Sequence, residues 1–383
     1  MSITSNKKER EFREQGGALW RARRARGCCR VSFRVGRRRR APFLRFELKR
    51  VNLSLLRVSE ELPSVTVLIA ARPDEAEVQA VAAARRLDYP REKLEIIVAR
   101  GKQPSVQRNT ALREARGELI YFLDDDSVPP AENLKRAVGA FADKSVQMVG
   151  GPNLCPPDAP FLEQVFAVTH ASWLAFFSSR ARYAKVGGLR PTSEKELILC
   201  NLVTRRSTML ELGGFNEALY PNEENALMDE MQRRGGKLLY DPELFVHRRP
   251  RRTLKSFCRM LLNYGRGRAE QVRVNPTLGS LANFVPPLFC VYLLLVVVLG
   301  GLRLAPYIWA PLAVYVLALV VQAAALLPMG GIVRSALAIP LMALTHVLYG
   351  IGFWKGLFTK LDREGAQKPE AAKVKVVVER ITI

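Results

Sequence analysis

Three consecutive carboxylates, Asp124 to Asp126, have the clearest chemical potential in this sequence. They follow an apolar run from Leu119 to Leu123 that has the composition of a short buried strand. In an extended segment, Asp124 and Asp126 are expected to face one way and Asp125 the other. Because hard divalent cations prefer oxygen ligands, this pair predicts a cation site that can neutralise a diphosphate. A solvated loop or a helix cap is the structural alternative.

Buried strands and helices alternate around these carboxylates. The expected strands are residues 65–70, 94–99, 119–123 and 146–149, and the expected helices are about 76–87, 106–115 and 131–142. This alternation is typical of an α/β fold with a mostly parallel sheet flanked by helices and joined by right-handed crossovers. Ligands bind such sheets at the carboxyl ends of the strands, where Arg72, Asp74 and Glu75 also lie.

A second acidic pair, Glu223 and Glu224, stands in the expected first turn of a helix that reaches about Arg234. The helix dipole favours negative charge at this end, which is the structural alternative to a catalytic role. A strand at 197–204 precedes this helix, and short strands at 238–240 and 244–247 follow it. We expect the α/β domain to cover residues 61–275.

The formal charge of +23 is concentrated in the first part of the 383-residue chain, where residues 1–50 contain 17 Lys and Arg against 4 Asp and Glu. We expect residues 1–60 to form a basic arm that is disordered or lies on anionic membrane lipids, with a functionless solvated tail as the alternative. Nucleic-acid binding ranks last, because the arm lacks the aromatic interleaving of a stacking platform and any known reader motif.

The six cysteines contain no CxxC pair and have no His-rich companion segment. A reduced, cytosolic chain without structural zinc fits this pattern best. The basic N-terminal residues are not followed by an apolar h-region, so we do not expect a secretory signal.

Three long apolar stretches, 281–302, 306–327 and 332–354, follow a strongly basic segment. A helix of about 22 residues spans about 33 Å, which is enough to cross the hydrocarbon core of a bilayer. The basic segment before these stretches and the polar tail at 359–383 both have a cytoplasmic signature. Three spans cannot put both on one side, so either one stretch is interfacial or re-entrant, with the third as the candidate, or the charge rule fails for the tail. We therefore expect two to three membrane or interfacial helices within 281–358.

Six short motifs between residues 64 and 268 resemble those of the family 2 glycosyltransferases and occur in the family's order. They are Val65-Thr-Val-Leu-Ile-Ala-Ala-Arg-Pro-Asp-Glu75, Pro104-Ser-Val-Gln-Arg-Asn109, Phe122-Leu-Asp-Asp-Asp126, Asn201-Leu-Val-Thr-Arg-Arg206, Gly213-Gly-Phe-Asn-Glu217, and Pro221-Asn-Glu-Glu-Asn-Ala-Leu227 with Arg234-Gly235. The resemblance implies a GT-A fold and an inverting, metal-assisted transfer of sugar from a nucleotide-diphosphate donor such as a UDP- or GDP-sugar. The apolar stretches are similar to those of membrane-bound members.

The resemblance also implies roles for individual residues. Glu224 takes the general-base position, with Glu223 beside it as the other half of the catalytic pair. The implied ligands for Mg²⁺ or Mn²⁺ are Asp126, Asp124 and His247. The implied nucleotide-sugar contacts are Arg72, Asp74, Glu75, Arg108, Asn109, Asp124 and Asp125, and Arg266 and Arg268 on the far side of the diphosphate. Asp125 also has a purely structural alternative, and Arg266 and Arg268 suit lipid headgroups equally well.

Three departures from the family pattern limit what can be inferred. The second strand ends in Val98-Ala-Arg-Gly101 without the acid that reads the base, which leaves the nucleotide open. The base position holds Glu in place of Asp. No Gln-x-x-Arg-Trp motif follows the catalytic helix, which argues against a processive polysaccharide synthase.

The sequence favours a multi-pass enzyme of the cytoplasmic membrane with its catalytic domain in the cytosol. It would move one sugar to a lipid-linked acceptor, such as a polyprenyl phosphate or a polyprenyl-diphosphate saccharide, in cell-envelope or exopolysaccharide synthesis. A catalytically inactive, membrane-anchored nucleotide-sugar-binding or scaffold protein is the alternative.

Overall fold

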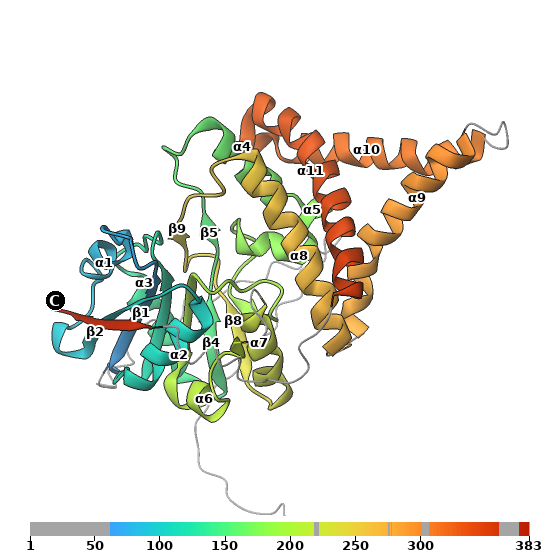
Figure 1. Ribbon diagram of the computed structural model, residues 1–383. Coiled ribbons are helices and arrows are strands. Elements are labelled where there is room, and N and C mark those ends of the chain that lie inside the picture. Colours follow the sequence, from blue (N-terminus) through green and yellow to red (C-terminus); the bar gives the residue numbers. More distant parts are fainter. Residues whose placement is uncertain are drawn as a thin grey trace, which may run out of the picture. The chain divides into compact units, whose positions relative to one another are not determined.

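The structure is a computed structural model that describes residues 62–217, 222–274, 276, 278–300, 306–359 and 375–382 (Figure 1). The described residues all belong to the second of two units into which the chain divides, Glu60–Ile383. The basic arm expected at residues 1–60, and its contact with anionic lipids, lie outside the described residues.

An eight-stranded sheet is the centre of the second unit, as far as the structure describes it. The strands are β1 (Val65–Ala71), β2 (Leu94–Arg100), β3 (Leu119–Asp124), β4 (Val146–Gly150), β6 (Arg190–Pro191), β7 (Asn201–Arg205), β8 (Lys237–Tyr240) and β10 (Val377–Ile381), in the order β10-β2-β1-β3-β7-β4-β8-β6. Strands β2, β1 and β3 are mutually parallel, as are β4 and β8. The antiparallel strand β7 lies between β3 and β4, so the sheet is mixed. This confirms the expected α/β fold with helices on both sides of the sheet.

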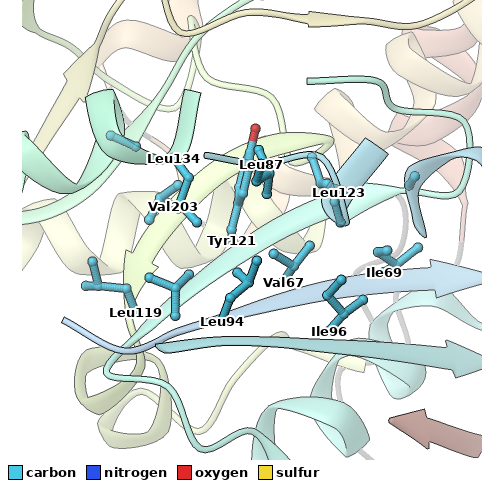
Figure 2. Close-up of a cluster of buried hydrophobic side chains, with 14 of the residues drawn as sticks. Val67, Ile69, Leu87, Leu94, Ile96, Leu119, Tyr121, Leu123, Leu134 and Val203 are labelled. Carbon is cyan, nitrogen blue, oxygen red and sulfur yellow. The ribbon is translucent and has the colours of Figure 1, made fainter. Parts of the chain in front are cut away.

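Helices cover both faces of the sheet because its central strands are apolar on both sides. On one face, Val67, Ile69 and Tyr121 pack with residues of α1 (Gln79–Ala84) and α3 (Asn133–Gly139) (Figure 2). On the other face, Leu68 and Phe122 pack with residues of α2 (Pro104–Glu114), α6 (Arg206–Glu211) and α7 (Glu223–Arg233). Each fully buried apolar side chain contributes roughly 1.5–3 kcal/mol, so this double core fixes the strand ends that carry the site.

The C-terminal segment returns to the sheet instead of remaining a polar tail. β10 pairs antiparallel with the edge strand β2, with Val377 opposite Arg100 and Ile381 opposite Ile96. Figure 1 shows β10 beside β2 at the edge of the sheet. The expectation of a polar tail at 359–383 is therefore wrong for residues 377–381, because their β-branched side chains suit an edge strand.

Among the residues that the structure describes, three helices are long and apolar enough to cross a membrane. The candidate spans are Leu281–Leu299, Tyr307–Ala325 and Leu327–Phe358, with mean hydropathies of 2.3, 2.0 and 1.7. They contain α9 (Val285–Gly300), α10 (Ala310–Ala325) and α11 (Leu327–Phe358). Helix α11 contains a non-helical residue at Gly331 and a proline at position 340.

Helix α11 differs from the other two because it packs closely on α8 (Leu254–Val274). A side chain at Gly265 would collide with the carbonyl of Tyr349, and one at Gly352 would collide with the carbonyl of Leu262. Arg273 donates to the carbonyl of Gly356 near the end of α11 at 2.9 Å. Small residues at these positions allow the two backbones to approach, as in membrane helix pairs.

The aromatic-rich residues 161–182 form α4 (Phe161–His170), α5 (Trp173–Phe176) and a 3₁₀ turn (Phe177–Arg182). Helix α4 packs against α11, and Phe166 stacks on Phe257 of α8 at a centroid distance of 4.4 Å. This stretch therefore has both a core side and exposed aromatic residues, of which Trp173 and Phe177 are more than half exposed.

Candidate functional site

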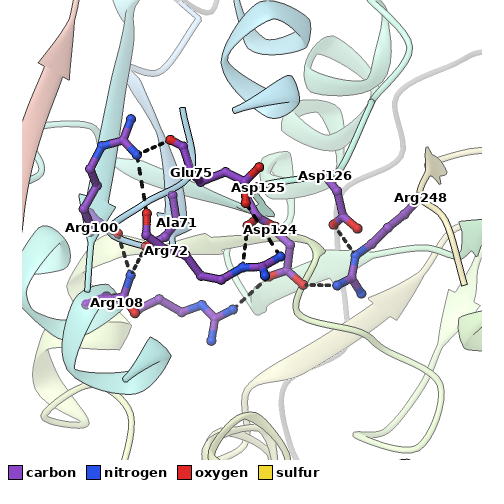
Figure 3. A network of polar contacts seen from close by, with 11 residues as sticks. Ala71, Arg72, Glu75, Arg100, Arg108, Asp124, Asp125, Asp126 and Arg248 are labelled. Carbon is purple, nitrogen blue, oxygen red and sulfur yellow. Dashed lines mark hydrogen bonds and ion pairs between the residues drawn. The ribbon is translucent and has the colours of Figure 1, made fainter. Parts of the chain in front are cut away.

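The three aspartates lie where β3 ends, at the carboxyl edge of the parallel strands. Asp124 is the last residue of β3 and stands opposite Ala70 of β1. Asp125 and Asp126 begin the turn that follows. Figure 3 shows all three carboxylates surrounded by arginine side chains from the neighbouring elements. The sheet edge therefore collects charge of both signs.

Asp124 is held between two guanidinium groups. Arg108 of α2 donates to its Oδ1 at 2.8 Å, and Nη2 of Arg248 lies 3.1 Å from its Oδ2. Burial works to raise the pKa of Asp124, but the charges of Arg248 and Arg108 outweigh burial and hold the pKa below its ordinary value. Asp124 is therefore ionised throughout the physiological pH range.

Asp126 shares the second arginine with Asp124. Nε of Arg248 donates to Oδ1 of Asp126 at 2.5 Å, so one guanidinium bridges both carboxylates. Arg248 is the residue that the sequence interpretation missed. It was counted in the basic segment before the membrane helices, although it directly follows His247, which was assigned a role.

Asp125 faces a different group, as its place in the alternation predicted. Its Oδ2 lies 3.9 Å from Nε of Arg72 in the loop after β1. Burial and the charges of its two aspartate neighbours raise its pKa. Asp125, Asp126 and Arg72 line a polar pocket of about 130 Å³. The remaining lining residues are Glu75, Glu77, Gln79, Arg249, Pro250 and Arg252.

Asp74 and Glu75, which were expected to contact the nucleotide, lie in the same loop as Arg72. Asp74 is exposed. The carbonyl of Glu75 accepts from Arg100 of β2 at 2.7 Å, and Arg100 also pairs with Glu379 of β10 at 2.9 Å. A carboxylate from the C-terminal strand thus stands beside the end of β2, where the sequence itself has no acid.

The catalytic-helix pair meets the aspartates through Arg108. Nη1 of Arg108 lies 3.5 Å from Oε1 of Glu223 at the start of α7, while its Nη2 binds Asp124. Glu223 is 2% exposed, and its Oε2 has no hydrogen-bond partner among the described residues. Burial and the charge of Glu224 raise the pKa of Glu223 to about 7. Glu224 is half-buried beside it.

Asn109 has a different contact from the one expected. It donates to the carbonyl of Phe215 at 2.8 Å and accepts from the Phe215 N–H at 2.8 Å. Its amide also donates to Glu217 at 2.9 Å. Gly214, with φ +80°, leaves no room for a side chain beside Asn109. Asn109 therefore holds the loop at Gly214–Glu217.

Arg266 and Arg268 lie on α8 and contact other groups. Nε of Arg266 lies 3.5 Å from Glu270. Arg268 donates to Gln271 at 2.9 Å and lies 4.0 Å from Glu194. Gln271 in turn donates to Asp229 of α7, whose pKa burial and Glu194 raise to about 6. The structure thus joins Arg268 to the rear of α7 and does not bring either arginine to the aspartates.

His247 lies beside the aspartate turn because a backbone bridge holds it there. Its N–H donates to Val128 and its carbonyl accepts from Val128, both at 2.9 Å. Strand β9 (Val246–His247) also pairs with β5 (Asn153–Leu154). His247 Nδ1 is buried and has no hydrogen-bond partner among the described residues.

Two carboxylates and an imidazole with an unpartnered nitrogen suit a divalent cation by donor type. In the arrangement described, however, no group of three or more His, Cys, Asp or Glu residues in the described ranges stands ready to hold a metal ion. The guanidinium of Arg248 takes the oxygens that the ion would need.

Comparisons with known proteins agree with the sequence motifs. The profile described as glycosyltransferase like family 2 matches residues 48–262. The pre-mycofactocin glycosyltransferases of two Mycobacterium tuberculosis strains, CDC 1551 / Oshkosh and ATCC 25618 / H37Rv, are 27% identical over 165 residues. That match covers 43% of this chain and 34% of each relative, so it spans about a third of the relatives' length.

Two solved structures are also similar. The mannosyltransferase PcManGT from Pyrobaculum calidifontis, in complex with GDP-Man and Mn²⁺, is 20% identical, with a TM-score of 0.46 over 79% of this chain and 88% of that one. TarS 1–349 from S. aureus is 12% identical, with a TM-score of 0.36 over 77% of this chain and 90% of that one. Because the family profile covers more than half of the sequence and its motifs lie on the mixed, helix-flanked sheet, the chain belongs to the family 2 glycosyltransferases.

Proposed function

We propose that this enzyme transfers a sugar, with inversion, from a nucleotide-diphosphate donor to a lipid-linked or membrane-proximal acceptor. The observation that carries the proposal is the link from Asp124 through Arg108 to Glu223. One buried guanidinium contacts both the sheet-edge carboxylates and the start of the acidic helix. A donor bound at the aspartates would therefore have its reacting carbon near the glutamate pair.

The donor's diphosphate is best accommodated at the sheet edge. Arg72 and Arg252 line the polar pocket beside Asp125 and Asp126, and they supply positive charge for phosphate oxygens. A divalent cation such as Mg²⁺ or Mn²⁺ would be held by Asp124, Asp126 and His247. When bound there, it would act as a Lewis acid that neutralises charge on the departing diphosphate.

Proton transfer falls to the glutamate pair. In the reaction, the acceptor hydroxyl attacks the anomeric carbon, a carboxylate takes the hydroxyl proton, and the bond from the carbon to the diphosphate oxygen breaks. We assign the base role to Glu224, which is half-buried at the helix start, and we assign Glu223 to the Arg108 contact that fixes the helix. Within the pair, burial and the charge of Glu224 raise the pKa of Glu223.

We further propose that the catalytic domain and the C-terminus lie on the same, cytosolic side of the membrane. β10 follows the three apolar helices and pairs with β2 of the catalytic sheet, which precedes them. A chain with both segments in one sheet crosses a bilayer an even number of times. Helices α9 and α10 are mostly exposed, which supports two crossings. The most apolar part of α11 is 33% buried, and α11 packs on the arginine-bearing α8, which supports an interfacial position for α11.

Donor-dependent transfer tests the proposal. Purified protein in detergent, given a panel of UDP- and GDP-sugars with a polyprenyl phosphate, should form product when Mg²⁺ or Mn²⁺ is present. Glu224→Gln should lower the transfer rate about a hundredfold or more while donor binding remains, because it removes a general base. Asp126→Asn should weaken metal-dependent donor binding. Glu230→Gln, on the same helix but paired with Arg234 at 2.8 Å, is the matched control.

Full transfer by Glu224→Gln would remove Glu224 as the base. A protein that binds nucleotide-sugars but transfers none of them would favour the alternative, an inactive membrane-anchored binding or scaffold protein. The ionised Asp124 and the Arg108 link to Glu223 argue for the active enzyme, because an inactive site has no need of this costly burial of charge.

A further inference from the structure

Arg248 occupies the position that the proposed function gives to a divalent cation. Its Nε lies 2.5 Å from Asp126 Oδ1 and its Nη2 lies 3.1 Å from Asp124 Oδ2 (Figure 3). Arg108 holds the other oxygen of Asp124. The two carboxylates that would bind the ion are thus already neutralised by the chain's own guanidinium groups.

The backbone of Arg248 is held by a hydrogen bond, whereas its side chain contacts Asp124 and Asp126 through the guanidinium group at its tip. The Arg248 N–H donates to Leu154 at 2.9 Å, and His247, the preceding residue, is bridged to Val128. The guanidinium is therefore aimed at the aspartates by the β5–β9 ribbon. A change of side-chain rotamer can withdraw it without breaking either backbone contact.

A guanidinium and a divalent ion cannot bind this pair together. Both are cations, and both need the inward-facing carboxylate oxygens, so each binds at the expense of the other. We propose, on the basis of the proposed function, that Arg248 holds Asp124 and Asp126 before the divalent ion binds and then turns to the donor's diphosphate. Asp124 and Asp126 then always have a cationic partner, and the guanidinium that the ion displaces binds the negatively charged diphosphate.

The surroundings give the displaced side chain a place to act. The 130 Å³ pocket beside Asp126 is lined by the neighbouring Arg249 and Arg252 and by Arg72. Arg249 is occupied, because it donates to the buried Glu163 of α4 at 2.7 Å. Arg248 lies next to it in sequence and carries the contact that metal binding would release. It is therefore the arginine of this segment best placed to bind phosphate only after the ion has arrived.

Mn²⁺ binding in the absence of nucleotide tests the first half of the proposal. Free Mn²⁺ is measured by electron paramagnetic resonance during titration of the full-length protein in detergent. Arg248→Gln should bind Mn²⁺ at least about tenfold more tightly than the wild type, because it removes a competing charge-assisted hydrogen bond. Arg248→Lys, which keeps the charge but cannot bridge two carboxylates, should lie between them.

Arg249→Gln is the matched control, since it removes an equal charge one residue away that is paired with Glu163. Its Mn²⁺ affinity should stay close to that of the wild type. Unchanged, weaker or absent Mn²⁺ binding by Arg248→Gln would overturn the proposal. An equal gain in Mn²⁺ affinity in Arg249→Gln would also overturn it, because the gain would then follow from the change in net charge alone.

Nucleotide binding tests the second half. At saturating Mn²⁺, Arg248→Gln should bind UDP or GDP more weakly than the wild type, by about tenfold for a lost charged contact. Equal or tighter nucleotide binding would refute the turn toward the diphosphate. Neither titration requires sugar transfer, so failure of this proposal is separable from failure of the proposed function, which the transfer assay measures.

Discussion

Neutralising Glu223 should stabilise the protein at alkaline pH and leave its stability unchanged at acidic pH. The side chain is 2% exposed, and burial together with the charge of Glu224 raises its pKa from the ordinary 4.5 to about 7. The folded state therefore holds this proton more tightly than the unfolded state. The stability that protonated Glu223 contributes is complete below about pH 4.5 and is lost as pH rises to about 7.

The size of the loss follows from the two pKa values. Each pKa unit corresponds to about 1.4 kcal/mol, so ionised Glu223 costs the folded state on the order of 3 kcal/mol above pH 7. Glu223→Gln removes this cost because glutamine does not ionise. At about 2 °C per kcal/mol for a domain of this size, its melting temperature at pH 8 should exceed that of the wild type by about 5 °C.

Thermal unfolding in detergent at several pH values between 4.5 and 8.5 is the assay. Between pH 4.5 and 7 the melting temperature of the wild type should fall more steeply than that of Glu223→Gln. The two melting temperatures should be equal at the acidic end of the range. Glu224→Gln should shift the fall to lower pH, because the charge of Glu224 helps to raise the pKa of Glu223. Parallel curves for wild type and Glu223→Gln, or a lower melting temperature for the variant at pH 8, would refute the reasoning.

Three further outcomes are expected. Gly214→Ala should destabilise the protein by more than the roughly 1 kcal/mol expected for a positive φ alone, because its side chain would collide with Asn109. Gly213→Ala, with φ +78° and open space around it, should cost only that amount. Equal melting temperatures of the two variants would show that Asn109 does not hold the loop. Membrane topology can be tested with impermeant thiol reagents on oriented vesicles that contain single-cysteine variants. Lys185→Cys and Thr382→Cys should be labelled from one side, and Tyr307→Cys, at a residue that is 84% exposed before α10, should be labelled from the other. Labelling of Lys185→Cys and Thr382→Cys from opposite sides would contradict an even number of crossings. Truncation after residue 374 should promote aggregation by uncovering the edge of β2, and an unchanged monomer fraction in size-exclusion chromatography would count against this protective role.

The carboxylate cluster was predictable because local sequence decides its place. The apolar run from Leu119 to Leu123 is buried on both faces, and its alternation with helices requires a strand at the centre of a sheet. The side chains that follow such a strand lie at the ligand edge by rule. The three aspartates were therefore placed correctly before any long-range contact was known.

The place of β7 in the sheet and the strand β10 were not predicted, because both depend on long-range pairing. Nothing local shows that β7 inserts antiparallel between β3 and β4, because its apolar run suits either direction. β10 did carry a signal, since Val376-Val-Val-Glu-Arg-Ile381 is rich in β-branched residues, but the lysines before it favoured a polar tail. Only the pairing with β2 shows that this segment closes the sheet.

The site residues divide in the same way. Arg108 and Asn109 stood together in one motif, yet Arg108 binds Asp124 while Asn109 turns to the loop before α7. Neighbouring helix positions point in different directions, so a shared motif does not imply a shared ligand. Arg266 and Arg268 suited either the diphosphate or lipid headgroups, because their charge does not say which face of α8 each side chain takes.

A short path of contacts joins Arg248, which holds the aspartates, to the helices that are apolar enough to cross a membrane. Helix α8 begins at Leu254, six residues after Arg248, and packs along α11 through Gly265, which has no room for a side chain. Arg249, between them, is tied to Glu163 of α4, and α4 also packs on α11. The segment that aims a guanidinium at the aspartates is thus anchored to the helices that would meet the lipid acceptor. If Arg248 withdraws when a divalent ion binds, the residues at the start of α8 are the first that can respond, whereas the β5–β9 ribbon on the other side holds its backbone in place.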